Sequence, residues 1–385
     1  MKGVNKENIK KYALNEFLSE YKELNTDNKY RPVAVGRYGI RKRESIYSKE
    51  LAKDYSKNKL IHKDTLTVGM GSKQIDIGIL IEDETFAVSP AYHTYKIQGI
   101  RCKYLEYCLQ SKNIEMFSLY AKRGSRQGKS IDLKRWLTYK IPVYSEEDQI
   151  VIEENLNKIN VVIELRRKQL ELLDELVRAR FVEMFGTLHD NENRFNIVTI
   201  EEVCSIIKDG THQTPHYTED KINGYKFLSS KDVMSQKINW ENIKYIPKDL
   251  HEKLYASIQP QRNDILMSKN GVNYGVAAVN DTDEVFDIYV SLALLRPKQL
   301  IDPVFFRCVI NSIETKRQFD MSIKGIGVPN LHLGEIKKTK IILPPMVLQK
   351  QFVTFVKQID KSRLRELLAI KQIKLLLHDS WFLFY

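Results

Sequence analysis

The longest regular pattern of apolar and polar positions lies in the middle of the chain. From Glu146 to Phe185 the sequence has neither Pro nor Gly, and apolar residues recur at intervals of three and four, which is the spacing of an amphipathic helix. Ser145 is a good N-cap residue with Asp148 at the third helical position, and Gly186 follows the end, as is typical of helix termini. The pattern predicts one helix of about 40 residues, about 60 Å long.

A second helix of the same kind is predicted after Pro344 and Pro345. In both helices the apolar residues cover one side only, so each helix needs a partner to bury that side. We call these residues the seam: Leu156, Ile159, Leu170, Leu173 and Val177 in the first helix, and Val356, Ile359, Ile370, Ile373 and Leu377 in the second. Antiparallel packing of the two helices on each other is the simplest arrangement. The alternative is that each helix is buried in its own domain.

Short apolar runs that are bounded by Gly, Pro or charged turns predict strands before each long helix. In the first half these runs are Val33–Val35, Thr65–Val68, Ile75–Leu80 and Thr85–Val88. In the second half they are Tyr225–Leu228, Asp264–Met267, Gly275–Val279 and Asp287–Leu292. A strand-rich stretch followed by a long helix therefore occurs twice, which indicates a mixed α/β (α+β) fold.

The two halves also match each other at a constant offset of 200 residues. Leu66 corresponds to Leu266, and among the other identities is the pair Gln149 and Gln349. The identity is low, but a constant offset indicates a duplicated unit. We therefore expect a pseudo-twofold repeat: globular domains at 1–144 and 187–343, separated by antiparallel, coiled-coil-like helices at 145–186 and 344–385.

Composition agrees with two domains and suggests the kind of partner. A chain of 385 residues with 43% hydrophobic residues can bury two cores, since domains are typically about 100–200 residues long. Lys and Arg number 61 against 49 Asp and Glu, a net charge of +12. This charge suits a polyanion but does not identify one.

The cysteines and the apolar runs indicate the cellular compartment of the chain. Cys102, Cys108, Cys204 and Cys308 show no paired spacing, so we expect reduced thiols and neither a zinc site nor a disulfide framework. No apolar run approaches the roughly 18 residues of a membrane span. We therefore expect a soluble, cytoplasmic protein without a membrane partner.

No motif of an autonomous enzyme is complete. Gly124 to Ser130 resembles a phosphate-binding loop but has three residues between its glycines, where that loop has four. Gly69 and Gly71 lack the third glycine of a dinucleotide fingerprint, so a site for S-adenosylmethionine is unsupported. His212 and His216 are separated by helix-breaking residues, which argues against a metal site. We expect no catalytic residue, no metal and no cofactor in this chain.

Basic and amide side chains in turn-rich segments are candidates for DNA contacts. Lys and Arg can neutralise phosphates, Arg can also pair with guanine, and Asn can pair with adenine. The candidates are Arg37, Arg41, Arg43, Arg123, Arg126 and Lys129 in the first half, and His212, Lys269, Asn270, Asn273 and Lys324 in the second.

Three segments resemble the specificity subunits of type I restriction-modification systems. They are Leu172-Leu-Asp-Glu-Leu-Val-Arg-Ala-Arg-Phe-Val-Glu-Met-Phe-Gly186, Ile207-Lys-Asp-Gly-Thr-His-Gln-Thr-Pro-His216, and the helix start from Pro344 to Gln349. The resemblance implies two target-recognition domains that each read one half of a split DNA sequence, with the paired helices setting the gap. Two methyltransferase subunits would dock on the helices and methylate adenine, and two motor-nuclease subunits could join them. S-adenosylmethionine, and ATP with Mg²⁺, would belong to those partners.

One departure from the pattern concerns the second long helix. It carries Arg363 and Glu366 where the first helix has Ile163 and Arg166. This leaves open whether the end of the chain is truncated or rearranged.

Two other functions remain open. A stand-alone DNA methyltransferase or nuclease would need a cofactor or metal site in this chain. A helical scaffold that binds proteins would make the basic loops incidental.

Overall fold

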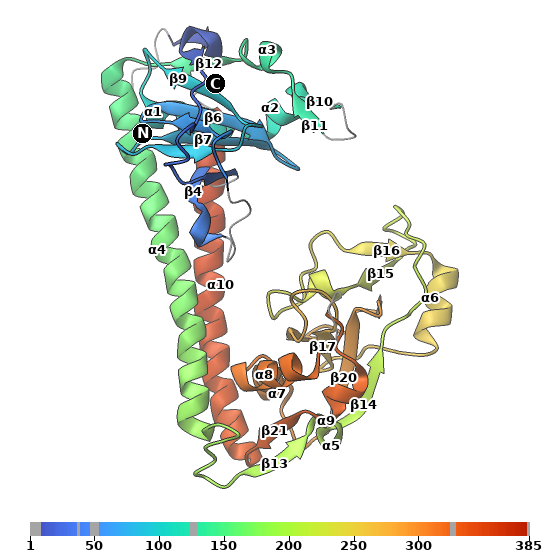
Figure 1. Ribbon diagram of the computed structural model, residues 1–385. Coiled ribbons are helices and arrows are strands. Elements are labelled where there is room, and N and C mark those ends of the chain that lie inside the picture. Colours follow the sequence, from blue (N-terminus) through green and yellow to red (C-terminus); the bar gives the residue numbers. More distant parts are fainter. Residues whose placement is uncertain (1–8, 37–38, 47–53, 124–128, 324–328, 383–385) are drawn as a thin grey trace. The chain divides into compact units, whose positions relative to one another are not determined.

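The computed structural model describes residues 9–36, 39–46, 54–123, 129–323 and 329–382 (Figure 1). The chain divides into two compact units. The first consists of Met1–Arg167 with Leu367–Tyr385, and the second consists of Lys168–Glu366. Both long helices pass from one unit into the other. Among the described residues, no helix combines the length and the apolar composition that crossing a membrane requires.

The first unit is built on a four-stranded antiparallel sheet in the order β2-β9-β6-β7. Its strands are β1 (Lys10–Ala13), β2 (Leu18–Glu20), β3 (Val33–Gly36), β4 (Gly39–Lys42), β5 (Lys59–Ile61), β6 (Thr65–Met70), β7 (Ile75–Leu80), β8 (Phe86–Val88), β9 (His93–Ile97), β10 (Ala121–Arg123), β11 (Lys129–Ile131) and β12 (Lys140–Val143). Its short helices are α1 (Cys102–Ser111), α2 (Asn113–Tyr120) and α3 (Leu133–Trp136). The core lies between this sheet and these helices and includes the fully buried Trp136 and Tyr95.

The second unit repeats this plan, with the sheet order β14-β20-β17-β18. Its strands are β13 (Asn196–Thr199), β14 (Cys204–Asp209), β15 (Tyr225–Leu228), β16 (Lys244–Ile246), β17 (Ile265–Ser268), β18 (Ala277–Val279), β19 (Phe286–Ile288), β20 (Leu292–Pro297) and β21 (Lys340–Leu343). Its short helices are α5 (Ile200–Val203), α6 (Lys248–Tyr255), α7 (Pro303–Ile310), α8 (Ile313–Ser322) and α9 (Leu333–Lys338). Each unit also has a two-stranded antiparallel sheet, formed by β1 and β12 in the first unit and by β13 and β21 in the second.

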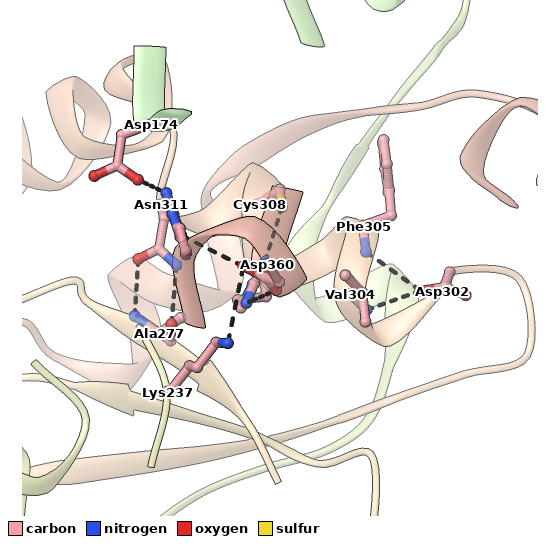
Figure 2. Close-up of polar contacts among 11 residues, drawn as sticks. Asp174, Lys237, Ala277, Asp302, Val304, Phe305, Cys308, Asn311 and Asp360 are labelled. Carbon is pink, nitrogen blue, oxygen red and sulfur yellow. Dashed lines mark hydrogen bonds and ion pairs between the residues drawn. The ribbon is translucent and has the colours of Figure 1, made fainter. Parts of the chain in front are cut away.

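Individual hydrogen bonds repeat along with the topology. The side chain of Asn113 bonds to both backbone polar groups of Ile75, with an N···O distance of 2.8 Å to its N–H and 2.9 Å to its carbonyl. Asn311 does the same to Ala277, at 2.9 Å in both bonds (Figure 2). Each bond pair ties the first short helices to the last strand of the four-stranded sheet. The predicted internal repeat is confirmed at the level of topology and of single side chains.

Both predicted long helices are present, as α4 (Glu146–Phe185) and α10 (Met346–Phe382) (Figure 1). The Ser145 hydroxyl accepts the Asp148 backbone N–H at 3.2 Å, which satisfies one of the free N–H groups of a helix start. Gly186 ends the helix with φ at +70°, a conformation that suits glycine.

The two long helices pair antiparallel inside each unit. In the second unit the ring of Phe181 on α4 lies 5.5 Å from that of Phe352 on α10, whereas the earlier Asp174 pairs with the later Arg363. In the first unit Leu377 packs on the core cluster that contains Leu156. Leu156, Val356, Ile359 and Ile370 are buried, and the other six seam residues, Ile159, Leu170, Leu173, Val177, Ile373 and Leu377, are half-buried.

One predicted strand is wrong. The run from Asp287 to Leu292 is not continuous, because the chain turns at 289–291 between β19 and β20, and the Leu292 N–H bonds to the Tyr289 carbonyl at 2.8 Å. β19 runs parallel to β15, whereas β20 pairs antiparallel with β14 and β17. Both sides of the turn are buried and the turn contains neither Gly nor Pro, so the apolar run alone gave no sign of it.

Candidate nucleic-acid interface

One edge of the sheet in the second unit brings several of the sequence candidates together. β14 and β17 both pair antiparallel with β20, so they run in the same direction and their carboxyl ends lie at the same edge. The segments that follow, residues 210–217 and 269–274, leave the sheet side by side. Asp209 at the end of β14 forms an ion pair with Lys269, directly after β17. We call these two segments the reading loops.

Lys269 does not have the place that the sequence predicted. It is 4% exposed, and its ammonium pairs with Asp209. Its backbone is held as well, because its N–H bonds to Ser291 at 2.9 Å and its carbonyl accepts from Leu331 at 2.9 Å. A buried and paired ammonium cannot reach a phosphate, so Lys269 fastens the two reading loops to each other.

The sequence segment from Ile207 to His216 forms the end of β14 and most of the first reading loop. A Cβ on Gly210 would lie 2.3 Å from the Ile288 carbonyl and 2.4 Å from that of Tyr289, so only glycine fits this crossing. The side chain of His212 is 76% exposed, and its Nε2 lies 3.6 Å from Asp209. Gln213, beside it, is exposed. The loop thus presents two polar side chains on a fixed backbone.

The second reading loop is a tight turn with amide side chains. Gly271 has φ at +85°, and its N–H bonds to the Pro329 carbonyl at 3.0 Å. Asn273 is exposed, while Asn270 is half-buried and its Oδ1 has no hydrogen-bond partner among the described residues. Val272 between them is 84% exposed. Amides in such a position could bond to base edges.

The first reading loop also contains an aromatic residue that was not predicted from the sequence. Tyr217 follows the Ile207–His216 segment directly and is about half exposed. The Lys244 ammonium lies 3.9 Å from the centre of its ring. Exposed aromatic rings and basic side chains are both common elements of nucleic-acid sites. The only signal in the sequence was the position of Tyr217 next to the segment.

The candidates of the first half are only partly described. Arg41 is exposed on β4, and Arg43 is half-buried just after that strand. Arg123 and Lys129 are backbone partners in the β10–β11 hairpin. Arg37 and Arg126, together with Lys324 of the second half, lie outside the described residues.

The corresponding edge of the first unit is built differently. Gly69 stands at the 200-residue offset from Lys269, and a Cβ there would lie 2.2 Å from the ring of Tyr92. The Tyr92 hydroxyl in turn donates to the Val35 carbonyl at 2.9 Å. The equivalent edges of the two units therefore present different side chains.

No group of three or more potential metal-ligating side chains occurs in the described part of the chain. The four cysteines are free thiols. Burial raises the pKa of Cys108 to about 12 and, despite the nearby Lys298, that of Cys204 to about 12. These two thiols lie in the apolar cores of their units.

Comparison with known proteins shows which family the chain is similar to. Residues 192–375 match the family model for the type I restriction modification DNA specificity domain. The MjaVIII specificity subunit of Methanocaldococcus jannaschii, a type I restriction enzyme subunit, is 24% identical over 247 residues, covering 60% of this chain and 57% of that protein. The MjaIX specificity subunit of the same organism is 22% identical over 295 residues, covering 72% of this chain and 67% of that protein.

The first of these matches thus spans a little over half of the relative's own length. A solved structure that concerns complex assembly and conformational transition of the type I R-M system superimposes with a TM-score of 0.53 at 15% identity, over 98% of this chain and 97% of the other. This likeness concerns the fold. In the sequence of residues 192–375 the chain is similar to the DNA specificity domain of type I restriction-modification systems, and in its fold it is similar to a solved structure of such a system.

Proposed function

We propose that this chain is the non-catalytic DNA-specificity subunit of a type I restriction-modification complex and reads a bipartite DNA target. Residues 1–144 and 187–343 would be the two target-recognition domains, and the helices at 145–186 and 344–385 the spacer between them. The observation that carries the proposal is the duplicated sheet with differing edges, β2-β9-β6-β7 and β14-β20-β17-β18. Two similar folds with unlike edges suit two different half-sites.

In the second domain the reading loops would enter the major groove. His212 and Gln213 from the first loop, and Asn270 and Asn273 from the second, carry donors and acceptors that fit base edges. The ion pair of Asp209 with Lys269 would keep these side chains in fixed positions. In the first domain Arg41, Arg43, Arg123, Arg126 and Lys129 would play the corresponding part, and Arg37 and Lys324 would add phosphate contacts.

The long helices would carry the methyltransferase subunits. Apolar side chains on the outer side of α4 are about half exposed, namely Val161, Val162, Leu165, Leu172, Leu176 and Val182. An apolar stripe on a surface helix marks a protein interface. Docked there, two methyltransferase subunits would receive an adenine in each half-site, and two motor-nuclease subunits would bind in turn. S-adenosylmethionine, and ATP with Mg²⁺, would be held by those partners.

The same apolar stripe favours a second candidate, a scaffold that binds proteins without reading DNA. The salt dependence of DNA binding separates the two. For the complex of this chain with its methyltransferase subunit, we expect duplex affinity to fall by about a thousandfold between about 50 and 200 mM salt. A competitor duplex of unrelated sequence should bind more weakly throughout. Affinity that is weak, and equal for all duplexes, would favour the scaffold.

A further inference from the structure

The junction between the globular part and the long helices uses the same sequence positions in both units. At the 200-residue offset, Tyr107 corresponds to Arg307 and Asn160 corresponds to Asp360. Tyr107 and Arg307 lie on α1 and α7, the helices that follow the four-stranded sheets. Asn160 and Asp360 lie on α4 and α10. The two junctions can therefore be compared position by position.

In the first unit the residues at these positions are neutral. The Tyr107 hydroxyl donates to Asn157 Oδ1 at 2.7 Å and accepts from Asn160 Nδ2 at 3.1 Å. Ile163, one turn further along α4, is buried. Hydrogen bonds and apolar packing hold these positions together, and nearby the buried Glu153 of α4 pairs with Arg101 at the start of α1.

The junction of the second unit is charged (Figure 2). Arg307 Nη1 lies 3.6 Å from Asp360 Oδ2, and Lys237 Nζ lies 3.9 Å from Asp360 Oδ1. Arg363 stands where the first unit has Ile163. The Nη1 of Arg363 lies 3.5 Å from Asp360 Oδ1, and its Nη2 forms an ion pair with Asp174 of α4. We call these five residues the charge cluster.

Arg307 is the deepest member of the charge cluster. It is 6% exposed, and its Nε has no hydrogen-bond partner among the described residues. Burial opposes its charge, but the neighbouring Cys308 and Asp360 outweigh this and raise the pKa of the guanidinium. Arg307 therefore stays charged. A buried charge has low energy only beside its partner, so Asp360 must stay opposite it.

Apolar packing at this junction is incomplete. A cavity of about 120 Å³ lies beside the charge cluster and is lined by apolar side chains that include Val177, Phe181, Phe352 and Val356. Apolar contacts beside a void are fewer than in a fully packed seam, so they fix the register less firmly. A polar group in a helix seam instead favours a single register.

We propose that the charge cluster fixes the position of the second recognition domain along the helix pair and so determines the length of the gap in the DNA target. Asp174, Arg307, Asp360 and Arg363 are then positioning residues, and this inference rests on the proposed function. A slip by one helical turn would displace the domain by about 5.4 Å. That distance exceeds the rise of about 3.4 Å per base pair, so a slip changes the gap that fits.

Two paired substitutions test this in the full chain, co-expressed with its methyltransferase subunit. Asp174→Leu with Arg363→Ile removes both charges of one pair and installs the apolar residue of the first unit. Arg307→Tyr with Asp360→Asn transplants the neutral pair of the first unit. Glu164→Ala with Arg167→Ala is the control, since it removes an exposed ion pair of α4. Methylated sites are then mapped across the host genome.

We expect both charge-cluster variants to keep the two half-site sequences and to methylate at gaps one or two base pairs from the wild-type gap at least about tenfold more often. The control should keep the wild-type gap. If one of the two charge-cluster variants no longer forms the folded complex, the other variant tests the inference. Wild-type gaps in a folded charge-cluster variant would overturn the inference. A wild-type chain that gives no bipartite methylation would instead refute the proposed function, and the inference with it.

Discussion

The side chains of Gln149 and Gln349 make equivalent hydrogen bonds in the two units. Gln149 Oε1 accepts the Arg101 N–H at 3.1 Å, and its Nε2 donates to the Tyr144 carbonyl at 2.9 Å. Gln349 Oε1 accepts the Asp302 N–H at 2.8 Å, and its Nε2 donates to the Pro344 carbonyl at 2.8 Å. In each unit one amide therefore joins the start of a long helix to the loop that leads into α1 or α7.

Replacing Gln349 should destabilise the second unit. Gln349 is fully buried, and its Nε2 also donates to the Leu300 carbonyl at 3.1 Å. Gln349→Leu would take this partner from the Asp302 N–H and from the carbonyls of Pro344 and Leu300. Each buried polar group that loses its partner costs about 1–3 kcal/mol, so we expect a loss of about 3 kcal/mol in the free energy of unfolding, measured by urea denaturation. The control is Lys350→Ala, at the exposed neighbouring position. Equal stability of the two variants would contradict the role of this amide.

Gly210→Ala should be poorly tolerated. The added Cβ would meet the carbonyl oxygens of Ile288 and Tyr289, and neither can move without shifting the turn between β19 and β20. We expect a loss of about 2 kcal/mol or more, measured by thermal unfolding. Gly334→Ala is the matched control, because nothing lies within 4 Å of its added Cβ and alanine favours the helix α9. Equal melting temperatures would contradict the tight crossing.

The long helices and the internal repeat could be predicted from the sequence, but the ion pair of Asp209 with Lys269 in the candidate interface could not. The forty residues of α4 contain no Pro or Gly, so the spacing of their apolar residues was enough to predict one continuous helix. Lys269 looked like any surface lysine, because its partner Asp209 is 60 positions away in the sequence and only sheet topology brings the two together. The turn at 289–291 was hidden for a similar reason, since buried strands on both sides gave one continuous apolar run.

Substitutions in the reading loops should change only one half of the DNA target. Asn273→Ala and His212→Ala each remove an exposed polar side chain, and we expect each to relax the choice of base at one position of one half-site by about 1–3 kcal/mol. The control is Gln299→Ala, which lies exposed after β20, at the opposite edge of the sheet. Methylation mapping reads the outcome. An unchanged motif in both reading-loop variants would remove these residues from the interface.

The apolar stripe on α4 should be needed for the partner. Leu172→Glu with Leu176→Glu places two charges on exposed positions, so the chain should fold while co-purification of the methyltransferase subunit falls at least about tenfold. Lys168→Ala with Glu175→Ala, at exposed polar positions of the same helix, should keep the complex. Retention of the partner by the glutamate variant would place its docking site elsewhere.

The cysteines should be unreactive in the folded chain. Burial raises the pKa of Cys108 and Cys204 to about 12, and burial together with the hydrogen bond to Asp64 raises that of Cys102 to about 12. A raised pKa leaves little thiolate at pH 8, so alkylation should be at least about a hundredfold slower than in urea. Mass spectrometry of time points measures this. Rapid labelling of one of these thiols in the native chain would contradict its burial.

The central claim is that the two units read two different half-sites of one DNA target. The most direct measurement is to co-express the chain with its methyltransferase subunit and map methylated adenines across the host genome. We expect one motif in two parts, separated by a gap of fixed length, with a methylated adenine in each part. A continuous motif, or no new methylation despite a stable complex, would contradict it.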